Sequence, residues 1–411
     1  MKILVLAGGF DQIALIQELK DRGHIVLLAD YFNNPPARQY ADIFFQISTL
    51  DEEKIYQLAY EEKVHLITTA CTDQALLTVA RVSERLNLPC YLSTSQALEV
   101  TNKCYMKQIF FSNGIKTADF HIIEDESNVQ KYVEMTNDYP VIVKPCDCNS
   151  SKGVLKISNR TKLVDAIEDA FKLSRSRKVI VEEYIEGKEL SIDVWVKCKN
   201  PTLLSVSETQ KVKDNEENFT IYSSAYPVDM NSKQKKNLER EILKIVEAFD
   251  IQDGPLLVQA IVKNDDIYIV EFSRRMGGGT KYKLIEYMSG VNIMKLYVDF
   301  VLNGDSELPE IQKSKYQYKL DYLYAYNGTI QKLEGFDETI EDGEAKEVFF
   351  YKKIGDKVAQ RLTSSDRIAG ILIEAKSNEE LIAKEKNILS KIKIIDTNQV
   401  NIMYLQCFQE G

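Results

Sequence analysis

One predicted hairpin carries the residues with the clearest chemical potential. Two apolar strands, 257–263 and 267–272, flank a polar turn of three residues. With this turn as the loop, Gln259 lies opposite Glu271, and Ser273 points to the same face two residues later. Few oxygen ligands, with room left for phosphate oxygens and water, suit magnesium carried by a nucleotide. We therefore expect Gln259, Glu271 and Ser273 to hold Mg2+, with Mn2+ as an alternative metal.

Two arginines and a glycine stretch follow this hairpin directly. Arg274 and Arg275 precede Met276 and the glycines at 277–279. Guanidinium groups bind phosphate through two parallel hydrogen bonds, and they lie here beside a carboxylate. The alternative interpretation, a polar outer face of a two-sided sheet, does not explain this combination. We expect a phosphoryl-transfer site with Arg274 and Arg275 as catalytic residues.

A second cluster lies upstream, in the apolar strand 140–145 and the loop after it. Lys144 interrupts the apolar strand, so its ammonium group must either reach solvent or meet an anion. In the loop, small and hydroxylated residues ending in glycine can present backbone N–H groups to phosphates. No Walker A pattern occurs, which excludes a P-loop NTPase. The predicted phosphate-binding residues here are Lys144, Ser150, Ser151, Lys152 and Gly153.

A third cluster follows the strand 179–183, which ends in acidic residues before a turn at Gly187. An acid near such a turn can accept hydrogen bonds from ribose hydroxyls, while exposed strand backbone can pair with the adenine edge. On its own this pattern is weak, because acidic hairpin tips are usually only solvated. The predicted nucleotide-binding residues are Glu182, Glu183, Tyr184, Ile185 and Glu189.

Bulk composition limits the classes of protein to consider. The chain has 411 residues, 44% hydrophobic and 28% charged, which indicates a globular protein of two or three domains. A net charge of -10 argues against nucleic acid as a partner. No apolar run is long enough to span a membrane. Seven scattered cysteines, without zinc-site spacing, favour reduced thiols and a cytoplasmic location.

The first hundred residues alternate apolar runs with amphipathic segments, which predicts a parallel sheet with crossover helices. The glycines at 8 and 9, with Asp30 after the second strand, resemble part of a dinucleotide fingerprint. The third glycine of that fingerprint is missing, since Ile13 occupies its place. NAD binding is therefore an alternative, and a simple tight turn is the preferred interpretation.

Taken in chain order, and with Lys103 upstream, these segments resemble the motif series of the ATP-grasp superfamily. The resemblance spans essentially the whole chain. It is nearest to L-amino acid ligases and to proteins similar to carbamoyl phosphate synthase and biotin carboxylase. It implies an α/β and α+β fold with a Rossmann-like N-terminal domain at 1–100 and a two-lobed ATP-clasping domain at 101–305. The lid lobe would occupy about 115–187, and a small α+β C-terminal domain 306–411.

The resemblance also implies roles for individual residues. Lys103 and Lys144 would contact the phosphates and adenine, residues 182–185 would line the adenine pocket, and Glu189 would bind the ribose. Arg275 would stabilise the phosphoryl group in transfer and the acyl phosphate. Ser273 departs from the family, which usually has asparagine there, and this weakens the case for a second magnesium ion. Another phosphate-binding lysine is expected from the large loop, and both Lys211 and Lys213 are candidates.

The function implied is that of a MgATP-dependent ligase. It would form an acyl phosphate from a small carboxylic acid and couple it to an amine, releasing ADP and phosphate. Alternatives are carbamoyl-phosphate-synthase-like or carboxylase activity on bicarbonate, and a non-catalytic ATP-binding module. A histidine-containing sequence follows the metal-site arginine in purine carboxylases, and residues 276–280 lack one. Specificity is expected from residues 72–74, the C-terminal domain and the glycines at 277–279, and a homodimer is left open.

Overall fold

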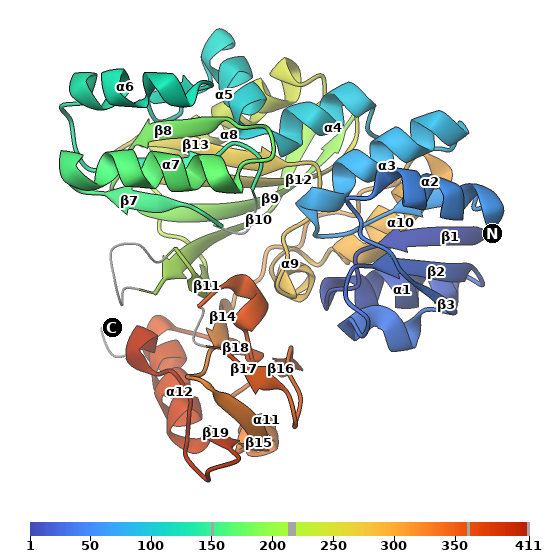
Figure 1. Cartoon of the computed structure of the whole chain (residues 1–411). Helices are drawn as coiled ribbons and strands as arrows, with labels where there is room; N and C mark the ends of the chain where they lie inside the picture. Colours follow the sequence, from blue (N-terminus) through green and yellow to red (C-terminus); the bar gives the residue numbers. More distant parts are fainter. Residues whose placement is uncertain (149–151, 213–218, 360–361, 409–411) are drawn as a thin grey trace.

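The computed structural model describes residues 1–148, 152–212, 219–359 and 362–408. Ser150, Ser151 and Lys213, which the sequence makes candidates for phosphate binding, lie outside the described residues. Within the described part the architecture is mixed α/β with several sheets, as predicted. Figure 1 shows an N-terminal α/β part, a long central sheet, a small lobe beside it and a C-terminal part below.

The N-terminal part is a parallel sheet with strand order β3-β2-β1-β4, covered by helices on both faces. Strands β1, β2 and β4 are almost entirely buried, as expected for a parallel sheet between helices, whereas the edge strand β3 is partly exposed. The predicted strand and helix alternation is therefore confirmed. The elements are β1 Lys2–Leu6, α1 Asp11–Asp21, β2 Ile25–Asp30, β3 Ile43–Gln46, α2 Glu52–Glu61, β4 Leu66–Thr68, α3 Asp73–Leu86 and α4 Thr94–Thr101.

The turn after β1 favours the tight-turn interpretation over dinucleotide binding. The backbone N–H of Gly8 donates to Asp30 Oδ2 at 2.6 Å, and that of Phe32 donates to Oδ1 at 2.7 Å. The carboxylate that would bind a ribose is thus used by the chain itself. A Cβ on Gly8 would lie 2.7 Å from Pro35, so the glycine allows close packing of its own chain.

A small antiparallel sheet, with order β5-β8-β6-β7, forms the separate lobe. Helices α6 and α7 cover one face of this sheet, and the core between them is apolar. The elements are α5 Lys103–Ser112, which leads into the lobe, β5 Phe120–Ile123, α6 Val129–Met135, β6 Val141–Pro145, β7 Leu155–Ile157, α7 Leu163–Leu173 and β8 Val179–Glu183.

The central sheet has eight strands in the order β13-β12-β9-β10-β11-β14-β18-β16. Its hydrogen-bonded ladder continues from the hairpin of β12 and β13, which carries Gln259 and Glu271, into strands that follow residue 305. The division of the chain near residues 100 and 305 stays a prediction. The elements are β9 Lys188–Lys197, β10 Asn200–Lys211, β11 Ile221–Tyr226, α8 Ser232–Ala248, β12 Gly254–Lys263, β13 Asp266–Ser273, α9 Lys281–Ser289, α10 Ile293–Asn303, β14 Gln317–Leu323, β16 Glu347–Phe350 and β18 Ala369–Ala375.

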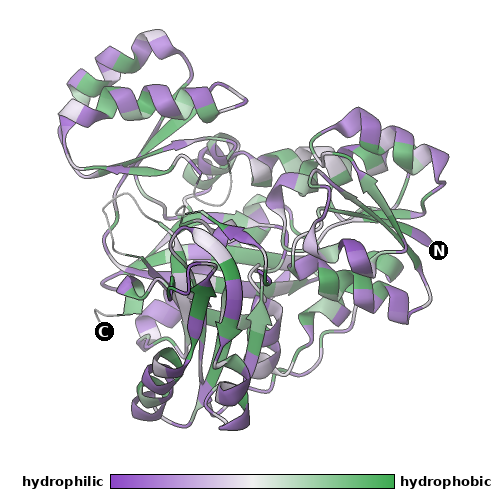
Figure 2. Ribbon diagram, turned by 60° about the horizontal axis from the view of Figure 1, so that its bottom comes forward, coloured by the Kyte–Doolittle hydropathy of each residue, from purple (hydrophilic) through white to green (hydrophobic). Residues whose placement is uncertain are grey.

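A three-stranded sheet, β17-β15-β19, and two helices complete the C-terminal part. These elements are β15 Gly328–Glu334, α11 Phe336–Glu341, β17 Lys357–Val358, α12 Asn378–Lys391 and β19 Lys393–Asp396. Short 3-10 turns lie at η1 Pro36–Tyr40, η2 Glu126–Asn128, η3 Arg160–Lys162, η4 Ser364–Asp366 and η5 Gln406–Phe408. Figure 2 shows the pattern behind this packing: strands are mainly hydrophobic, and helices turn hydrophilic residues outward.

Helix starts agree with the sequence only in part: the sequence predicts Ser377, with Glu380, at the start of the last helix and Ser232 as the cap of a helix over 233–249. Ser377 caps α12 as predicted, accepting from the N–H of Glu380. Helix α8 differs, because Asn231 and not Ser232 is its N-cap, in a capping box with Gln234. Asparagine and serine cap equally well, so two adjacent candidates could not be separated by type.

The cysteines also differ from the prediction of reduced thiols. Cys104 and Cys146 form a disulfide, whereas Cys71, Cys90 and Cys148 are among the free thiols. The first turn of α5 lies against the end of β6, which brings the two Cα atoms to 5.6 Å. The two cysteines are 42 residues apart in sequence, and this spacing alone gives no sign of their contact.

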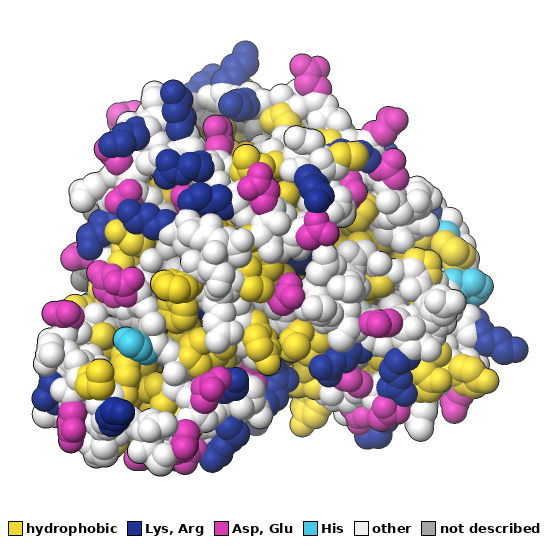
Figure 3. All heavy atoms as spheres, turned by 90° about the horizontal axis from the view of Figure 1, so that it is seen from above, with side chains coloured by type: hydrophobic (Ala, Val, Ile, Leu, Met, Phe, Trp, Pro, Cys, Tyr) yellow, Lys and Arg dark blue, Asp and Glu magenta, His cyan; other side chains and the backbone are white. Residues whose placement is uncertain are grey.

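The surface carries charges of both signs. In the face shown in Figure 3, basic and acidic side chains alternate over short distances, with hydrophobic side chains between them. Among the described helices, none combines the length and the apolar character that crossing a membrane would require.

Candidate active site

The hairpin of β12 and β13 has the predicted pairing at its centre. Gln259 is opposite Glu271 in the β12–β13 ladder, as the sequence indicated. The route to this register differs, because Lys263 pairs with Asp266 around a two-residue turn and not a three-residue loop. A β-bulge between Gln259 and Ala260 restores the pairing.

A small cavity of about 30 Å³ gathers several of the predicted residues. This volume is close to that of one water molecule. Glu271 Oε2 lies 3.2 Å from Lys103 Nζ, and the buried Oγ of Ser273 has no hydrogen-bond partner among the described residues. The predicted residues on the cavity wall are Lys103, Gln259, Glu271, Ser273 and Arg275.

The donor set fits a metal ion that is shared with a nucleotide. Within the described residues no group of three His, Cys, Asp or Glu side chains could hold a metal by itself. Glu271, the amide oxygen of Gln259 and the unpartnered hydroxyl of Ser273 supply three oxygen atoms. Magnesium keeps several waters and takes phosphate oxygens for the rest of its shell.

Charge pairing holds this region together electrostatically. Burial lowers the pKa of Lys103, but Glu271 and Asp73, with a smaller effect of Cys148, together raise it more, so the net shift is upward. Burial raises the pKa of Glu271, and Lys103 and Lys144 outweigh this, so the carboxyl stays ionised. An ionised Glu271 is the form that a metal cation requires.

The two arginines after β13 have different surroundings. Arg275 binds both carboxylate oxygens of Asp73, with an Nε–Oδ1 distance of 2.7 Å, and it lines both the small and the large cavity. Arg274 turns away: it donates to the carbonyl oxygen of Asp253 and lies over the ring of Tyr91. Arg274 is 3% exposed, and burial lowers its pKa to about 10. The structure therefore brings Arg275 to the site and leaves Arg274 outside it.

Lys144 meets an anion supplied by the protein. Glu182, on the neighbouring strand β8, lies 2.7 Å from Lys144 Nζ and 3.0 Å from Lys107 Nζ. Glu182 is 6% exposed, and burial raises its pKa, but the two lysines lower it to about 2. Burial lowers the pKa of Lys107 to about 8. Sequence reasoning missed Lys107, although its position one helical turn after Lys103 was a usable signal.

The remaining predicted nucleotide-binding residues are spread along the edge of this region. Glu183 is exposed, Ile185 is buried, and the ring of Tyr184 lies beneath the ammonium group of Lys156. Glu189 Oε2 forms an ion pair with Lys211 at 2.5 Å. Lys152 lines the large cavity. Gly153 has a φ of +73°, which supports the predicted need for glycine at that loop end.

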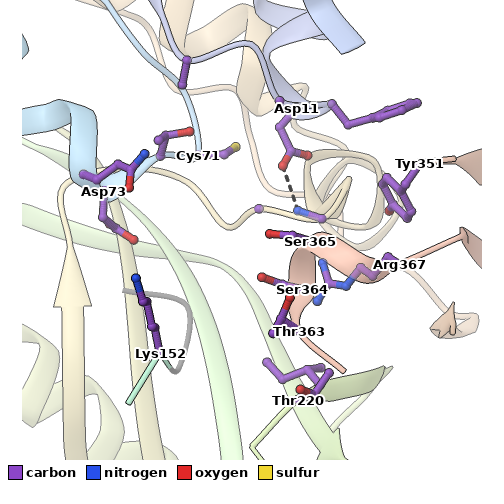
Figure 4. Close-up of a pocket in the computed structure, with 18 of the residues that line it drawn as sticks. Asp11, Cys71, Asp73, Lys152, Thr220, Tyr351, Thr363, Ser364, Ser365 and Arg367 are labelled. Carbon is purple, nitrogen blue, oxygen red and sulfur yellow. Dashed lines mark hydrogen bonds between the residues drawn. The ribbon is translucent and has the colours of Figure 1, made fainter. Parts of the chain in front are cut away.

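A large cavity of about 1760 Å³ lies beside the small one and opens between the N-terminal, central and C-terminal parts. Residues 72–74, residues 277–279 and several C-terminal residues line it, as the specificity prediction requires. Figure 4 shows Asp11, Tyr351 and Arg367 around one end of this cavity and Asp73 and Lys152 around the other.

The glycine stretch is fixed by two carboxylates that the sequence analysis did not select. Asp11 accepts from the N–H groups of Gly279, at 2.9 Å, and of Thr280, at 2.7 Å. Asp193 accepts from the N–H of Gly277 at 2.8 Å. Burial raises the pKa of Asp11, and the two amide hydrogen bonds oppose this only partly. No local motif marks either acid, since their partners are more than 80 residues away in sequence.

Comparisons with known proteins agree with this site. A sequence model of the D-ala D-ala ligase C-terminus matches residues 109–296. A D-alanine–D-alanine ligase from Staphylococcus carnosus is 24% identical over 325 residues, covering 71% of this chain and 88% of that protein. The solved L-amino acid ligase from Bacillus licheniformis superposes with a TM-score of 0.80 at 21% identity, covering 97% of this chain and 99% of that one. N5-carboxyaminoimidazole ribonucleotide synthetase from Thermotoga maritima superposes with a TM-score of 0.74 at 19% identity, covering 96% of this chain and 99% of that one.

Fold and relatives agree with the resemblance to the ATP-grasp superfamily that the motifs carry. The protein is an ATP-dependent carboxylate–amine ligase, an enzyme that joins a small carboxylate to an amine as an amide or peptide bond. The alternative of a non-catalytic nucleotide-binding module is thereby set aside.

Proposed function

We propose that this ligase couples free amino acids, and that MgATP phosphorylates the first of them at its carboxylate. The observation that carries the proposal is the shared cavity wall of Lys103, Glu271 and Arg275, which continues into the large cavity beside the glycine stretch. The relatives named for amino acid ligation point to the same substrate class. The cytoplasm, where ATP and free amino acids are available, is the proposed location.

In the proposed complex, Gln259, Glu271 and Ser273 would hold the metal, with magnesium expected and manganese as a substitute. The ion would neutralise the negative charge of the nucleotide phosphates during transfer. Lys103 and Lys144 would face the nucleotide, with Glu189 near the ribose. Lys152 would approach the phosphates from the loop after β6.

The chemistry proceeds in two transfers. An oxygen of the acid's carboxylate attacks the γ-phosphorus, the bond to the bridging oxygen breaks, and ADP leaves. The amine nitrogen then attacks the acyl carbon, phosphate departs, and the amine proton passes to the departing phosphate. Arg275, positioned by Asp73, would stabilise the charge that develops in both steps. Enclosure by the three parts of the chain would protect the acyl phosphate from water.

The decisive experiment measures ADP release with single amino acids and with pairs of them, and identifies products by mass. We expect ADP formation that depends on an amino acid, and a product whose mass is the sum of the two amino acids minus one water. Bicarbonate, with and without ammonia, forms a second arm. Turnover with bicarbonate and none with amino acids would replace the proposal by a carboxylase-like activity.

A further inference from the structure

Two cations on the wall of the large cavity lack an acidic partner. Lys281 is 6% exposed, and its Nζ donates to Ser207 Oγ at 3.1 Å. Arg367 Nε donates to the hydroxyl of Tyr324 at 3.3 Å, and its guanidinium lies 3.6 Å from the ring centre of Tyr322. In the part of the chain that the structure describes, neither cation forms an ion pair with a carboxylate.

The nearby carboxylates are already occupied. Asp193 accepts from the amide of Gly277 at 2.8 Å and from Ser205 Oγ at 2.9 Å. The oxygens of Asp11 accept two further backbone amides, and Asp73 binds Arg275. Each of these three acids therefore has other hydrogen-bond partners. Among the described residues, none of the three forms an ion pair with Lys281 or Arg367.

The glycine stretch leaves the space through which both cations reach the cavity. A Cβ on Gly279 would lie 2.3 Å from Arg367 Nη1 and 2.9 Å from the hydroxyl of Tyr322. A Cβ on Gly277 would lie 3.1 Å from Lys281 Cδ. A side chain at Gly279 would displace the Arg367 guanidinium, and one at Gly277 would crowd Asp193 Oδ1, 3.0 Å away, and the stem of Lys281, so the absence of side chains here has a physical reason. Figure 4 shows Arg367 at this wall of the cavity, beside Tyr351 and Ser364.

A buried lysine and a half-buried arginine that both line this cavity favour an anionic ligand. Burial lowers the pKa of Lys281 to about 8, Asp193 opposes this shift, and Arg367 and Arg275 add to it. A carboxylate between the cations would offset their repulsion and accept charge-assisted hydrogen bonds from both. The surrounding hydroxyls of Tyr351 and Thr280 already bind each other at 2.7 Å, so they do not replace such a ligand.

We propose that Lys281 and Arg367 bind a substrate carboxylate other than the one that is phosphorylated. This inference rests on the proposed function, in which the reacting carboxylate lies near Arg275. The second carboxylate belongs either to the amine substrate, which is then an α-amino acid or a peptide, or to a dicarboxylic donor. Simple amines with simple monocarboxylic acids would leave the subsite empty.

The test compares substrates with and without this carboxylate. Acceptor pairs are L-alanine against L-alaninamide, and donor pairs are L-glutamate against L-glutamine. For the pair that uses the subsite, Arg367→Gln should raise the KM of the carboxylate-bearing member about 10- to 100-fold, the range expected for a lost charge-assisted hydrogen bond. The KM for ATP and the KM of the carboxylate-free member should stay unchanged. Whichever pair responds identifies the source of the carboxylate.

Matched variants separate recognition from folding. Arg240→Gln removes an exposed guanidinium whose contact is the neighbouring Glu241, and it should behave as the wild type. Arg367→Lys keeps the charge and should recover part of the affinity that Arg367→Gln loses. Lys281→Met should raise the KM of the same substrate that Arg367→Gln affects. Equal effects of Arg367→Gln on both members of each pair, or no effect on either, would overturn the inference.

A binding measurement keeps this inference distinct from the proposed function. If no amino acid causes ADP release, the proposed function fails. The subsite is then tested by calorimetric titration of the ADP-bound protein with each of the four compounds. Tighter binding of a carboxylate-bearing compound than of its amide, lost in Arg367→Gln, supports the subsite. Equal affinities, or no binding of any of the four, overturn it.

Discussion

Replacing Glu182 by glutamine should strongly destabilise the protein, because this one carboxylate forms ion pairs with two buried ammonium groups. Glu182 lies 2.7 Å from Lys144 Nζ and 3.0 Å from Lys107 Nζ, and it is 6% exposed. The pKa of Glu182 falls from 4.5 to about 2 on folding, which corresponds to roughly 3 kcal/mol. Breaking a buried ion pair from one side typically costs about 3–5 kcal/mol. We expect Glu182→Gln to lower the free energy of unfolding by about 3 kcal/mol at pH 7.

The pH dependence gives this prediction a sign. The folded pKa of Glu182 is lower than the unfolded value, so its contribution is complete above pH 4.5 and is lost as the pH falls to about 2. The stability difference between the wild type and Glu182→Gln should therefore shrink across this window. Urea unfolding followed by circular dichroism at a series of pH values measures it.

The adjacent residue supplies the control. Glu183 is exposed on the same strand, and Glu183→Gln should change the free energy of unfolding by no more than about 0.5 kcal/mol. Adding Lys144→Met to Glu182→Gln should recover part of the loss, because one unpaired ammonium group is removed. A loss below about 1 kcal/mol for Glu182→Gln, or a difference that does not vary with pH, would refute the reasoning.

Three further predictions concern turnover in the ADP-release assay. Arg275→Gln should lower kcat about 100- to 1,000-fold with little change in the KM for ATP, because its charge acts on the group in transfer; an unchanged kcat would remove Arg275 from the mechanism. Glu271→Gln should raise the magnesium concentration for half-maximal activity by more than about tenfold, since an anionic ligand is lost, and an unaltered magnesium curve would place the metal elsewhere. Asp73→Asn should lower kcat by up to about 100-fold by releasing Arg275 from its fixed position, and rates equal to the wild type would contradict this positioning role.

Sequence alone predicted the parts of the site that depend on local pattern. The pairing of Gln259 with Glu271 followed from strand alternation, and it survived a wrong turn length because a bulge compensated for it. For Lys144 in an apolar strand the sequence left solvent or an anion open, and its partner is the protein's own Glu182, while the predicted contact with the nucleotide stays a prediction.

Other features could not be predicted, because they depend on contacts between distant segments. Arg274 and Arg275 are adjacent and chemically alike, and only the path of the chain after β13 turns one toward the cavity and the other toward Tyr91. Asp11 and Arg367 meet the glycine stretch from opposite ends of the chain, and no local pattern marks them. The roles assigned to single residues in nucleotide binding stay predictions.

The eight-stranded ladder restricts how this enzyme can move. Backbone hydrogen bonds join β11 to β14 and β14 to β18. The hairpin with Glu271 and the segment that leads from Arg367 into β18 are therefore linked through one continuous sheet. If the Glu271 hairpin and the Arg367 segment moved independently, backbone hydrogen bonds of this sheet would have to break. The four-stranded sheet with Lys144 and Glu182 shares no ladder with that sheet among the described strands. The lobe of this four-stranded sheet can therefore shift as a unit without breaking the ladder of the eight-stranded sheet.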